Sequence, residues 1–85
     1  MSQATQIYSR EFDAVFLKLS LQLRELIETK IHDLGGRLDT FPRQRLKGRP
    51  EYRLRVGDYR IIYEFERERS VLYLIAVGHR RDVYR

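Results

Sequence analysis

Apolar residues recur first at helical spacing along the chain and then at every second position. Residues 3–8 alternate weakly and predict an edge strand. From residue 9 to residue 34, two apolar stripes repeat every three or four positions, with Ser9 and Ser20 where N-caps belong. Two glycines at 35–36 end the second stripe. This half of the chain therefore predicts a strand followed by a hairpin of two helices.

The second half predicts an antiparallel sheet. Residues 37–50 carry turn signals and form a connector, after which residues 52–56 and 59–66 alternate around a Gly-Asp pair suited to a type II′ turn. Residues 71–77 are apolar on both faces, which predicts a central strand. The fold class is therefore α+β in the order β-α-α-β-β-β, with the N-terminal strand and the helix hairpin packed on a small antiparallel sheet. We expect a single domain over residues 1–85.

Composition excludes several classes of protein. The chain has no Cys and only two His, so a disulfide scaffold, a thiol nucleophile and a metal site are not expected, and we predict no cofactor. No apolar run approaches the roughly 18 residues of a membrane span, and the N-terminus lacks the apolar core of a signal peptide. We therefore expect a small, soluble, cytoplasmic protein with no membrane partner.

Basic residues are concentrated in the second half of the chain. Residues 10–34 carry four basic and five acidic groups, whereas residues 37–85 carry thirteen basic and seven acidic groups, a net charge of +6. Fourteen of the seventeen basic residues are Arg, whose planar guanidinium binds phosphate through two parallel hydrogen bonds and stacks on nucleobases. The excess suits nucleic acid, although a solvated basic face has the same composition.

The expected hairpin register gathers arginines on one face of the sheet. Pairing around the Gly-Asp turn sets Arg55 opposite Arg60, and Arg53 shares their face, away from the apolar positions. Like charges directly opposite one another destabilise a sheet. An anion bound among the three guanidiniums would account for their proximity. In the alternative, Glu64 and Glu66 neutralise them in a solvated ladder.

The C-terminal segment extends this basic surface. Because the last strand should run antiparallel to residues 59–66, Arg80 and Arg81 are expected near Arg60. Tyr84 follows on a polar tail, where it either stacks on a base or caps the sheet edge. Contacts to RNA phosphates are expected from Arg81 and from three basic residues of the connector, Arg45, Lys47 and Arg49.

Residues 46–85 contain a series of short motifs. These are a Leu-Lys-Gly turn, a Tyr-Arg-Leu-Arg strand, Gly-Asp-Tyr-Arg, an Ile-Ile-Tyr strand and a closing Val-Gly-His-Arg-Arg-Asp-Val-Tyr. Together they resemble the C-terminal half of RelE-type toxins in the RelE/ParE superfamily. The resemblance implies a toxin that enters the ribosomal A site and cleaves mRNA without a metal, by attack of a 2′-OH on the adjacent phosphate. As partners it implies a RelB-like antitoxin, in a hetero-oligomer, and the ribosome.

The resemblance also implies catalytic roles for individual residues. Arg53 and Arg55 match two family lysines on the same strand. Arg60 and Arg80 match family arginines, and Tyr84 matches the C-terminal tyrosine. The arginine cluster expected from strand register thus coincides with the family's site.

The change from lysine to arginine leaves the general base open. A lysine with a depressed pKa can accept a proton, whereas Arg53 and Arg55 stay protonated and can only stabilise negative charge. His79 is the remaining candidate for a neutral base, although the RelE pattern has a basic residue there rather than a catalytic one.

These observations support three hypotheses. The first is a metal-independent, ribosome-dependent endoribonuclease, an mRNA interferase. The second is a ParE-like inhibitor of DNA gyrase, with the same fold and no nuclease chemistry. The third is an inactive toxin remnant that still binds its antitoxin. The lysine-to-arginine changes at Arg53 and Arg55 are the reason to keep this hypothesis. Retention of Arg60, Arg80 and Tyr84 favours the first.

Overall fold

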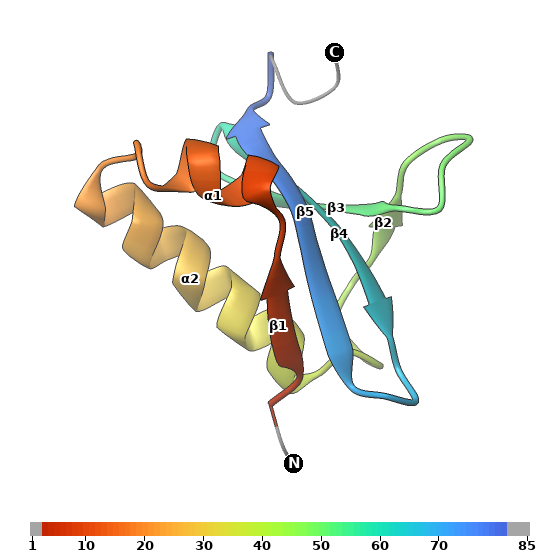
Figure 1. Cartoon of the computed structure of the whole chain (residues 1–85). Helices are drawn as coiled ribbons and strands as arrows, with labels where there is room; N and C mark the ends of the chain where they lie inside the picture. Colours follow the sequence, from red (N-terminus) through yellow and green to blue (C-terminus); the bar gives the residue numbers. More distant parts are fainter. Residues whose placement is uncertain (1–2, 82–85) are drawn as a thin grey trace.

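The computed structural model describes residues 3–81, which form a five-stranded mixed sheet with two helices packed on one face (Figure 1). The strand order is β1-β5-β4-β3-β2, so β1 and β2 are the edges. The predicted α+β class is confirmed. The elements are β1 (Thr5–Tyr8), α1 (Arg10–Phe16), α2 (Leu21–Gly36), β2 (Gln44–Arg45), β3 (Tyr52–Val56), β4 (Tyr59–Glu66) and β5 (Val71–His79).

Serine caps begin both helices, as the sequence predicts. The Ser9 hydroxyl accepts a hydrogen bond from the Phe12 backbone N–H at 3.0 Å, and the Ser20 hydroxyl accepts one from the Leu23 N–H at 3.2 Å. Ser9 also donates to the carbonyl of Ile75 in β5, so one side chain begins α1 and fastens it to the sheet. The second helix runs through both glycines that were expected to end it.

One apolar core lies between the helices and the sheet. Its sheet members come from alternate positions of β3 and β4, because alternate side chains of a strand point to the same face. The aromatic and aliphatic face of the hairpin is therefore the face beneath the helices, as expected. The principal core residues are Phe12, Ile27, Ile31, Leu34, Leu54, Val56, Ile61, Tyr63, Leu72, Leu74 and Val77.

The β3–β4 hairpin has the predicted register. Arg55 pairs with Arg60, and Leu54 pairs with Ile61. Gly57 has a φ of +60°, which suits the first loop residue of a type II′ turn. A shift of one residue would send every side chain of the strand to the other face, so this turn determines which side chains share a face.

The last strand, β5, is central as predicted but longer, and its pairing contains a bulge. It ends at His79, two residues beyond the expected end at residue 77, and pairs antiparallel with β4. The register shifts between Ile62 and Tyr63, which leaves Ile75 as the extra residue. This is the residue whose carbonyl accepts the hydrogen bond from the α1 cap.

The two edge strands differ from the prediction in different ways. The first strand, β1, runs parallel to β5, with Thr5 beside Val71 and Tyr8 beside Leu74. A parallel neighbour needs a long crossover, which the helices and the hairpin supply. The strand β2 has two residues, lies inside the predicted connector and pairs with the start of β3. It is too short for alternation to predict it.

Candidate functional site

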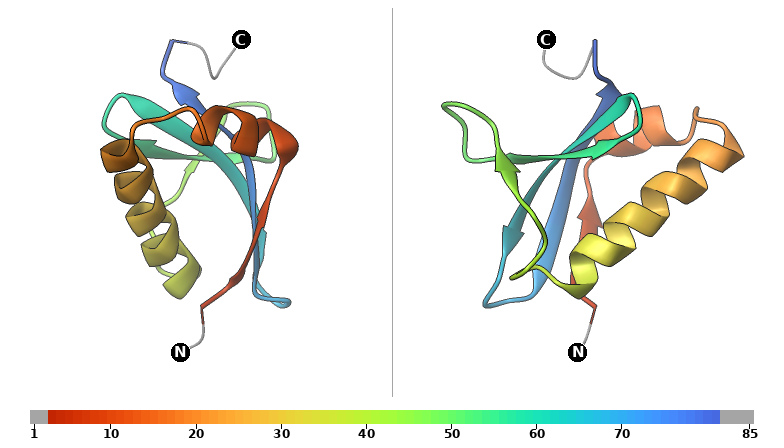
Figure 2. Two further views of the ribbon diagram at one scale, coloured as in Figure 1. Left: turned by 60° about the vertical axis from the view of Figure 1, so that its left-hand side comes forward. Right: turned by 180° about the vertical axis from the view of Figure 1, so that it is seen from behind.

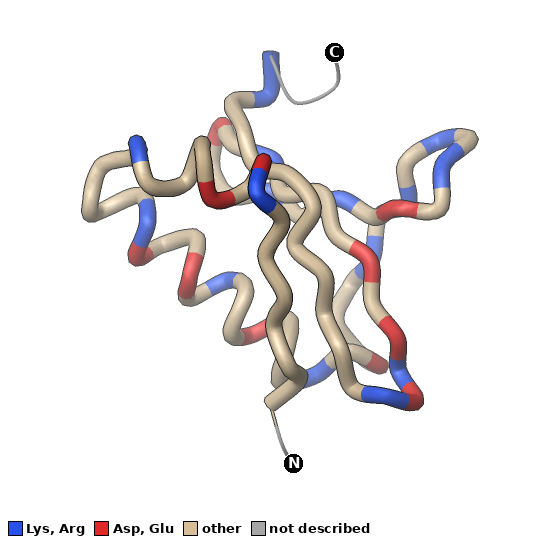
Figure 3. Tube along the Cα trace, viewed as in Figure 1, with Lys and Arg blue, Asp and Glu red and all other residues tan. Residues whose placement is uncertain are grey.

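Arg53, Arg55 and Arg60 lie on the side of the sheet away from the helices, which we call the arginine face. Arg53 pairs with Ile62, and Arg55 pairs with Arg60. Directly paired residues share a face, and the face continues onto β5 through Gly78, the partner of Arg60. Figure 3 shows further basic positions in the loop between β2 and β3 and beyond the end of β5. The register thus brings the three predicted arginines together.

Arg60 is the buried member of the arginine face. It is 6% exposed, and its Nε has no hydrogen-bond partner among the described residues. Its Nη1 makes one long contact, 3.5 Å from the Tyr59 carbonyl. Burying a donor without a partner costs roughly 1–3 kcal/mol, and more for a charged group. Across the strand it faces Arg55, so an anion here would supply both the missing hydrogen bond and the opposite charge.

The acidic end of β4 does not neutralise this pair. Glu66 accepts a hydrogen bond from the Tyr73 hydroxyl at 2.9 Å, which raises the pKa of that tyrosine, and it lies 3.5 Å from Arg69. None of the salt bridges within residues 3–81 includes Arg55 or Arg60. The solvated-ladder interpretation therefore does not account for the Arg55–Arg60 pair.

Arg80 is held beside the β3–β4 turn. Its backbone N–H donates to the Asp58 carbonyl at 2.8 Å, and the side chains of Arg80 and Arg81 are exposed. The segment after β5 therefore adjoins the start of β4 and Arg60, as antiparallel pairing predicts. Tyr84 lies outside the described residues.

His79 lies on the opposite side of the sheet from the arginines. It pairs with Tyr59, and the two rings meet edge to face with centroids 5.6 Å apart. Its Nδ1 accepts a hydrogen bond from the Arg81 backbone N–H at 3.3 Å. Since neighbours along a strand point to opposite faces, His79 is on the helix side while Gly78 shares the face of Arg60. The structure does not bring this candidate base to the arginine face.

Lys47 and Arg49 lie in the loop between β2 and β3, which projects beyond the sheet (Figure 2). Both are exposed, and the Arg49 Nε lies 3.1 Å from a carboxylate oxygen of Glu51. At the base of the loop, the Leu46 N–H donates to the Glu51 carbonyl at 3.0 Å. A projecting basic loop suits contact with phosphates rather than with a reacting group.

Arg45 lies on a different surface from the arginine face. It pairs with Tyr52 and so points to the helix side; its guanidinium lies 5.2 Å from the Tyr52 ring centroid. Arg43, which was not predicted from the sequence, lies 5.2 Å from the Phe65 ring centroid and 6.0 Å from that of Tyr52. Only the density of basic residues at 43–49 signals Arg43, because its ring contacts join distant segments.

Groups of three or more potential metal ligands do not occur within residues 3–81. Over the same residues, neither helix has the length and apolar character that crossing a membrane requires. The groups that define the candidate site are therefore the guanidiniums of the arginine face.

Residues 5–84 match the family described as the ParE toxin of type II toxin-antitoxin system, parDE. The chain belongs to this family. Its predicted membership in the RelE/ParE superfamily is thereby confirmed. No curated protein sequence matches the chain significantly.

Solved structures of RelE toxins share the fold. A chain of the intact E. coli RelBE toxin-antitoxin complex is 25% identical, with a TM-score of 0.71 over 89% of this chain and 95% of that chain. The isolated E. coli RelE toxin is 23% identical, with a TM-score of 0.77 over 95% and 90%. A chain of the Mycobacterium tuberculosis RelBE2 complex is 21% identical, with a TM-score of 0.75 over 96% and 97%. These similarities establish the fold. The activity is inferred from the arginine face.

Proposed function

We propose that this toxin is a ribosome-dependent endoribonuclease that cleaves mRNA in the A site. Membership of the toxin family supports a toxic role, and the arginine face supports the chemistry. The observation that carries the proposal is Arg60, a buried guanidinium with an unpartnered Nε, directly opposite Arg55. A phosphodiester at this position would accept hydrogen bonds from both side chains and balance their charge.

In the proposed reaction, a 2′-OH of the mRNA attacks the adjacent phosphorus. The 2′ oxygen loses its proton as it bonds to phosphorus, the bond from phosphorus to the 5′ oxygen breaks, and that oxygen gains a proton. The products are a cyclic phosphate and a 5′-OH. Arg55 and Arg60 are presented on paired backbone and can stabilise the charge that grows on the phosphorane oxygens. We assign the stabilisation of the leaving oxygen to Arg80, whose backbone is held beside the β3–β4 turn.

Proton transfer is the step that guanidiniums cannot perform. Arg53 and Arg55 stay protonated, and His79 points to the helix side. We therefore propose that the decoding centre aligns the 2′-OH with its phosphate, because alignment alone can lower the barrier by several kcal/mol. Naked RNA should accordingly be a poor substrate, and Tyr84 is expected to stack on a base.

Inhibition of DNA gyrase is the second candidate. The family match favours it, since the description names ParE rather than RelE. The arginine face favours the nuclease, because an inhibitor without phosphate chemistry has no need for a buried guanidinium that no salt bridge within residues 3–81 neutralises. An inactive remnant that binds antitoxin is the third candidate. It is supported by Arg53 and Arg55, which stand at two positions where the RelE pattern has lysine.

One induction experiment separates the three candidates. The protein is expressed from a controlled promoter, mRNA ends are mapped by primer extension, and plasmid topology is measured in the same culture. Cuts inside codons, in frame and only in translated messages, support the nuclease. Relaxed or cleaved plasmid without mRNA cuts supports gyrase inhibition, and the absence of both supports the remnant.

We also propose that a RelB-like antitoxin binds and neutralises this protein in the cytoplasm. Two of the structures with the same fold are complexes of a RelE toxin with its antitoxin. The test is co-purification with the product of the adjacent small gene and recovery of growth when both are expressed. If that product neither binds nor restores growth, the proposal of this partner fails.

A further inference from the structure

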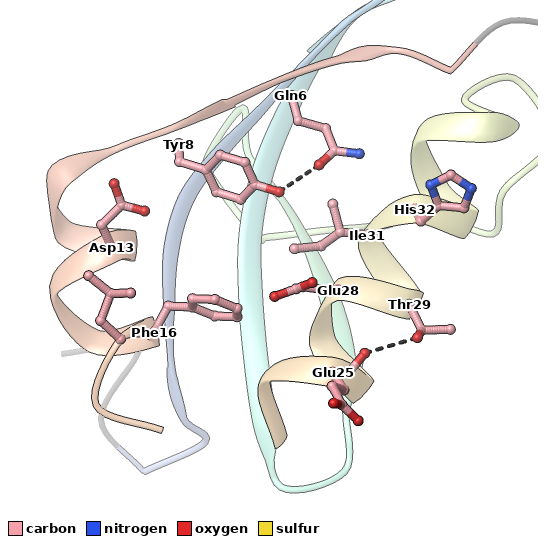
Figure 4. A pocket seen from close by; sticks show the side chains of 10 residues that line it. Gln6, Tyr8, Asp13, Phe16, Glu25, Glu28, Thr29, Ile31 and His32 are labelled. Atoms are coloured by element: carbon pink, nitrogen blue, oxygen red, sulfur yellow. Dashed lines mark hydrogen bonds between the residues drawn. The ribbon is translucent and has the colours of Figure 1, made fainter. Parts of the chain in front are cut away.

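A groove of about 780 Å³ lies on the helix side of the molecule, away from the arginine face. The end of β1 and α1 form one wall, and α2 forms the other (Figure 4). Tyr8, Phe16 and Ile31 supply apolar lining, and Leu17 continues it at a position that is 68% exposed. Exposed apolar surface of this kind commonly marks a site of interaction.

Three carboxylates also line the groove, together with the uncharged Gln6 and Thr29 and with His32. Asp13 of α1 and Glu25 and Glu28 of α2 line the groove, and none of its described lining residues is Lys or Arg. Figure 4 shows Glu28 reaching from α2 toward the Tyr8 side. No salt bridge within residues 3–81 includes any of the three carboxylates. Burial raises the pKa of Tyr8, and the negative charges of Glu28 and Asp13 raise it further. The described part of the groove therefore carries more negative than positive charge.

The charge and the apolar lining together restrict the occupant. Nucleic acid does not fit, because its phosphates would approach three carboxylates. A second copy would have to present its basic face, and a contact between two different faces repeats into a ring or an open filament rather than a simple dimer. A protein segment with Lys or Arg side chains beside an apolar stripe matches both features of the groove.

We propose that the groove binds a cationic amphipathic segment of the antitoxin. The inference rests on the proposed antitoxin partner and specifies the chemistry of one contact. Apolar side chains of the segment cover Tyr8, Phe16 and Leu17, and its basic side chains meet Glu25 and Glu28.

Charge reversal on α2 tests this contact. The double variant Glu25→Lys/Glu28→Lys changes two exposed side chains, so the fold should be retained, which thermal unfolding checks. The ligand is the product of the adjacent small gene, and its binding is measured by isothermal titration calorimetry. We expect its dissociation constant to rise roughly 30-fold. The toxic activity of the unbound protein should not change, and a Lys-to-Glu change in the antitoxin segment should restore binding.

Asp39→Lys/Glu68→Lys is the matched control for the double variant, because Asp39 and Glu68 are exposed acids outside the groove. If the double variant binds antitoxin as tightly as the control, the inference is overturned while the antitoxin proposal stands. If the antitoxin does not bind the wild-type protein, both fail. If reversal instead changes the oligomeric state of the toxin alone in sedimentation, the occupant is a second copy and the inference is wrong.

Discussion

Arg60 and Tyr63 lie on opposite faces of β4, and each buries a polar atom that has no hydrogen-bond partner within the described residues. Arg60 is 6% exposed and Tyr63 is 0% exposed. Their surroundings differ. The ring of Tyr63 packs among other aromatic rings, with centroids 5.7 Å from that of Tyr52 and 6.4 Å from that of Phe65. Arg60 faces a second guanidinium, that of Arg55.

The two sites differ because one group can remain neutral and the other cannot. Burial raises the pKa of Tyr63 to about 12, so its hydroxyl keeps its proton at physiological pH, and an unpartnered hydroxyl is only a cost of core packing. A guanidinium does not lose its charge in a protein. Since none of the salt bridges within residues 3–81 includes Arg60, its environment supports the proposal of a bound anion.

The largest effect is expected from Arg60→Ala. If Arg60 stabilises the phosphorane, its removal should lower the single-turnover rate of mRNA cleavage on saturated ribosomes by about 10²–10³, the usual cost of losing one pre-organised donor. Ribosome affinity and thermal stability should be retained. Arg69→Ala is the matched control, because Arg69 is exposed and paired with Glu66 at the other end of the strand. Normal cleavage by Arg60→Ala at saturation would make the arginine face a docking surface.

Alkaline unfolding should show that Tyr63, unlike Arg60, is uncharged in the folded protein. In the unfolded chain this tyrosine loses its proton near pH 10, whereas in the folded protein it does so only near pH 12. Deprotonation therefore favours the unfolded state over that interval, and the free energy of unfolding should fall by up to about 2–3 kcal/mol through this residue alone. Urea unfolding of wild type and Tyr63→Phe at pH 8 and pH 11 isolates the contribution. Parallel losses in the two proteins would show that the pKa is not raised.

Arg60→Met should separate stability from activity. Methionine keeps much of the apolar packing of the arginine stem and removes a buried charge that faces Arg55. We expect the free energy of unfolding to rise by about 1–2 kcal/mol, with cleavage lost. Arg69→Met should be close to neutral, since Arg69 is exposed. A less stable Arg60→Met protein would mean that the folded chain already satisfies Arg60, and the anion site would lose its main support.

The smallest effect is expected from Lys47→Ala, in the projecting loop. Losing one phosphate contact should weaken ribosome binding modestly and lower the slope of log affinity against log salt by about one unit. Cleavage at saturation should be almost unchanged, because Lys47 is exposed and lies in the loop that projects beyond the sheet. Binding measured across a salt series tests this. An unchanged slope with slowed cleavage would assign the loop to the chemical step instead.

Features that depend on a few adjacent residues were predictable. Ser9 and Ser20 begin their helices through hydrogen bonds to backbone groups three positions ahead. The two-residue turn at Gly57 sets Arg55 opposite Arg60. The arginine face followed from that register. The acidic groove did not, because its walls come from β1, α1 and α2 and meet only in the folded chain.

The sequence by itself determined the two helices, the hairpin register and the side chains that share each strand face, because helix caps, period-two alternation and turn length act locally. Tertiary structure decided the rest. The parallel pairing of β1, the bulge at Ile75 and the extension of β5 that places His79 on the helix side all depend on contacts between distant segments. The burial of Arg60, with no salt bridge to it from the described residues, is of the same kind. The burial and the charge balance of a side chain depend on all the residues that surround it in space. A local pattern of residues does not identify those neighbours.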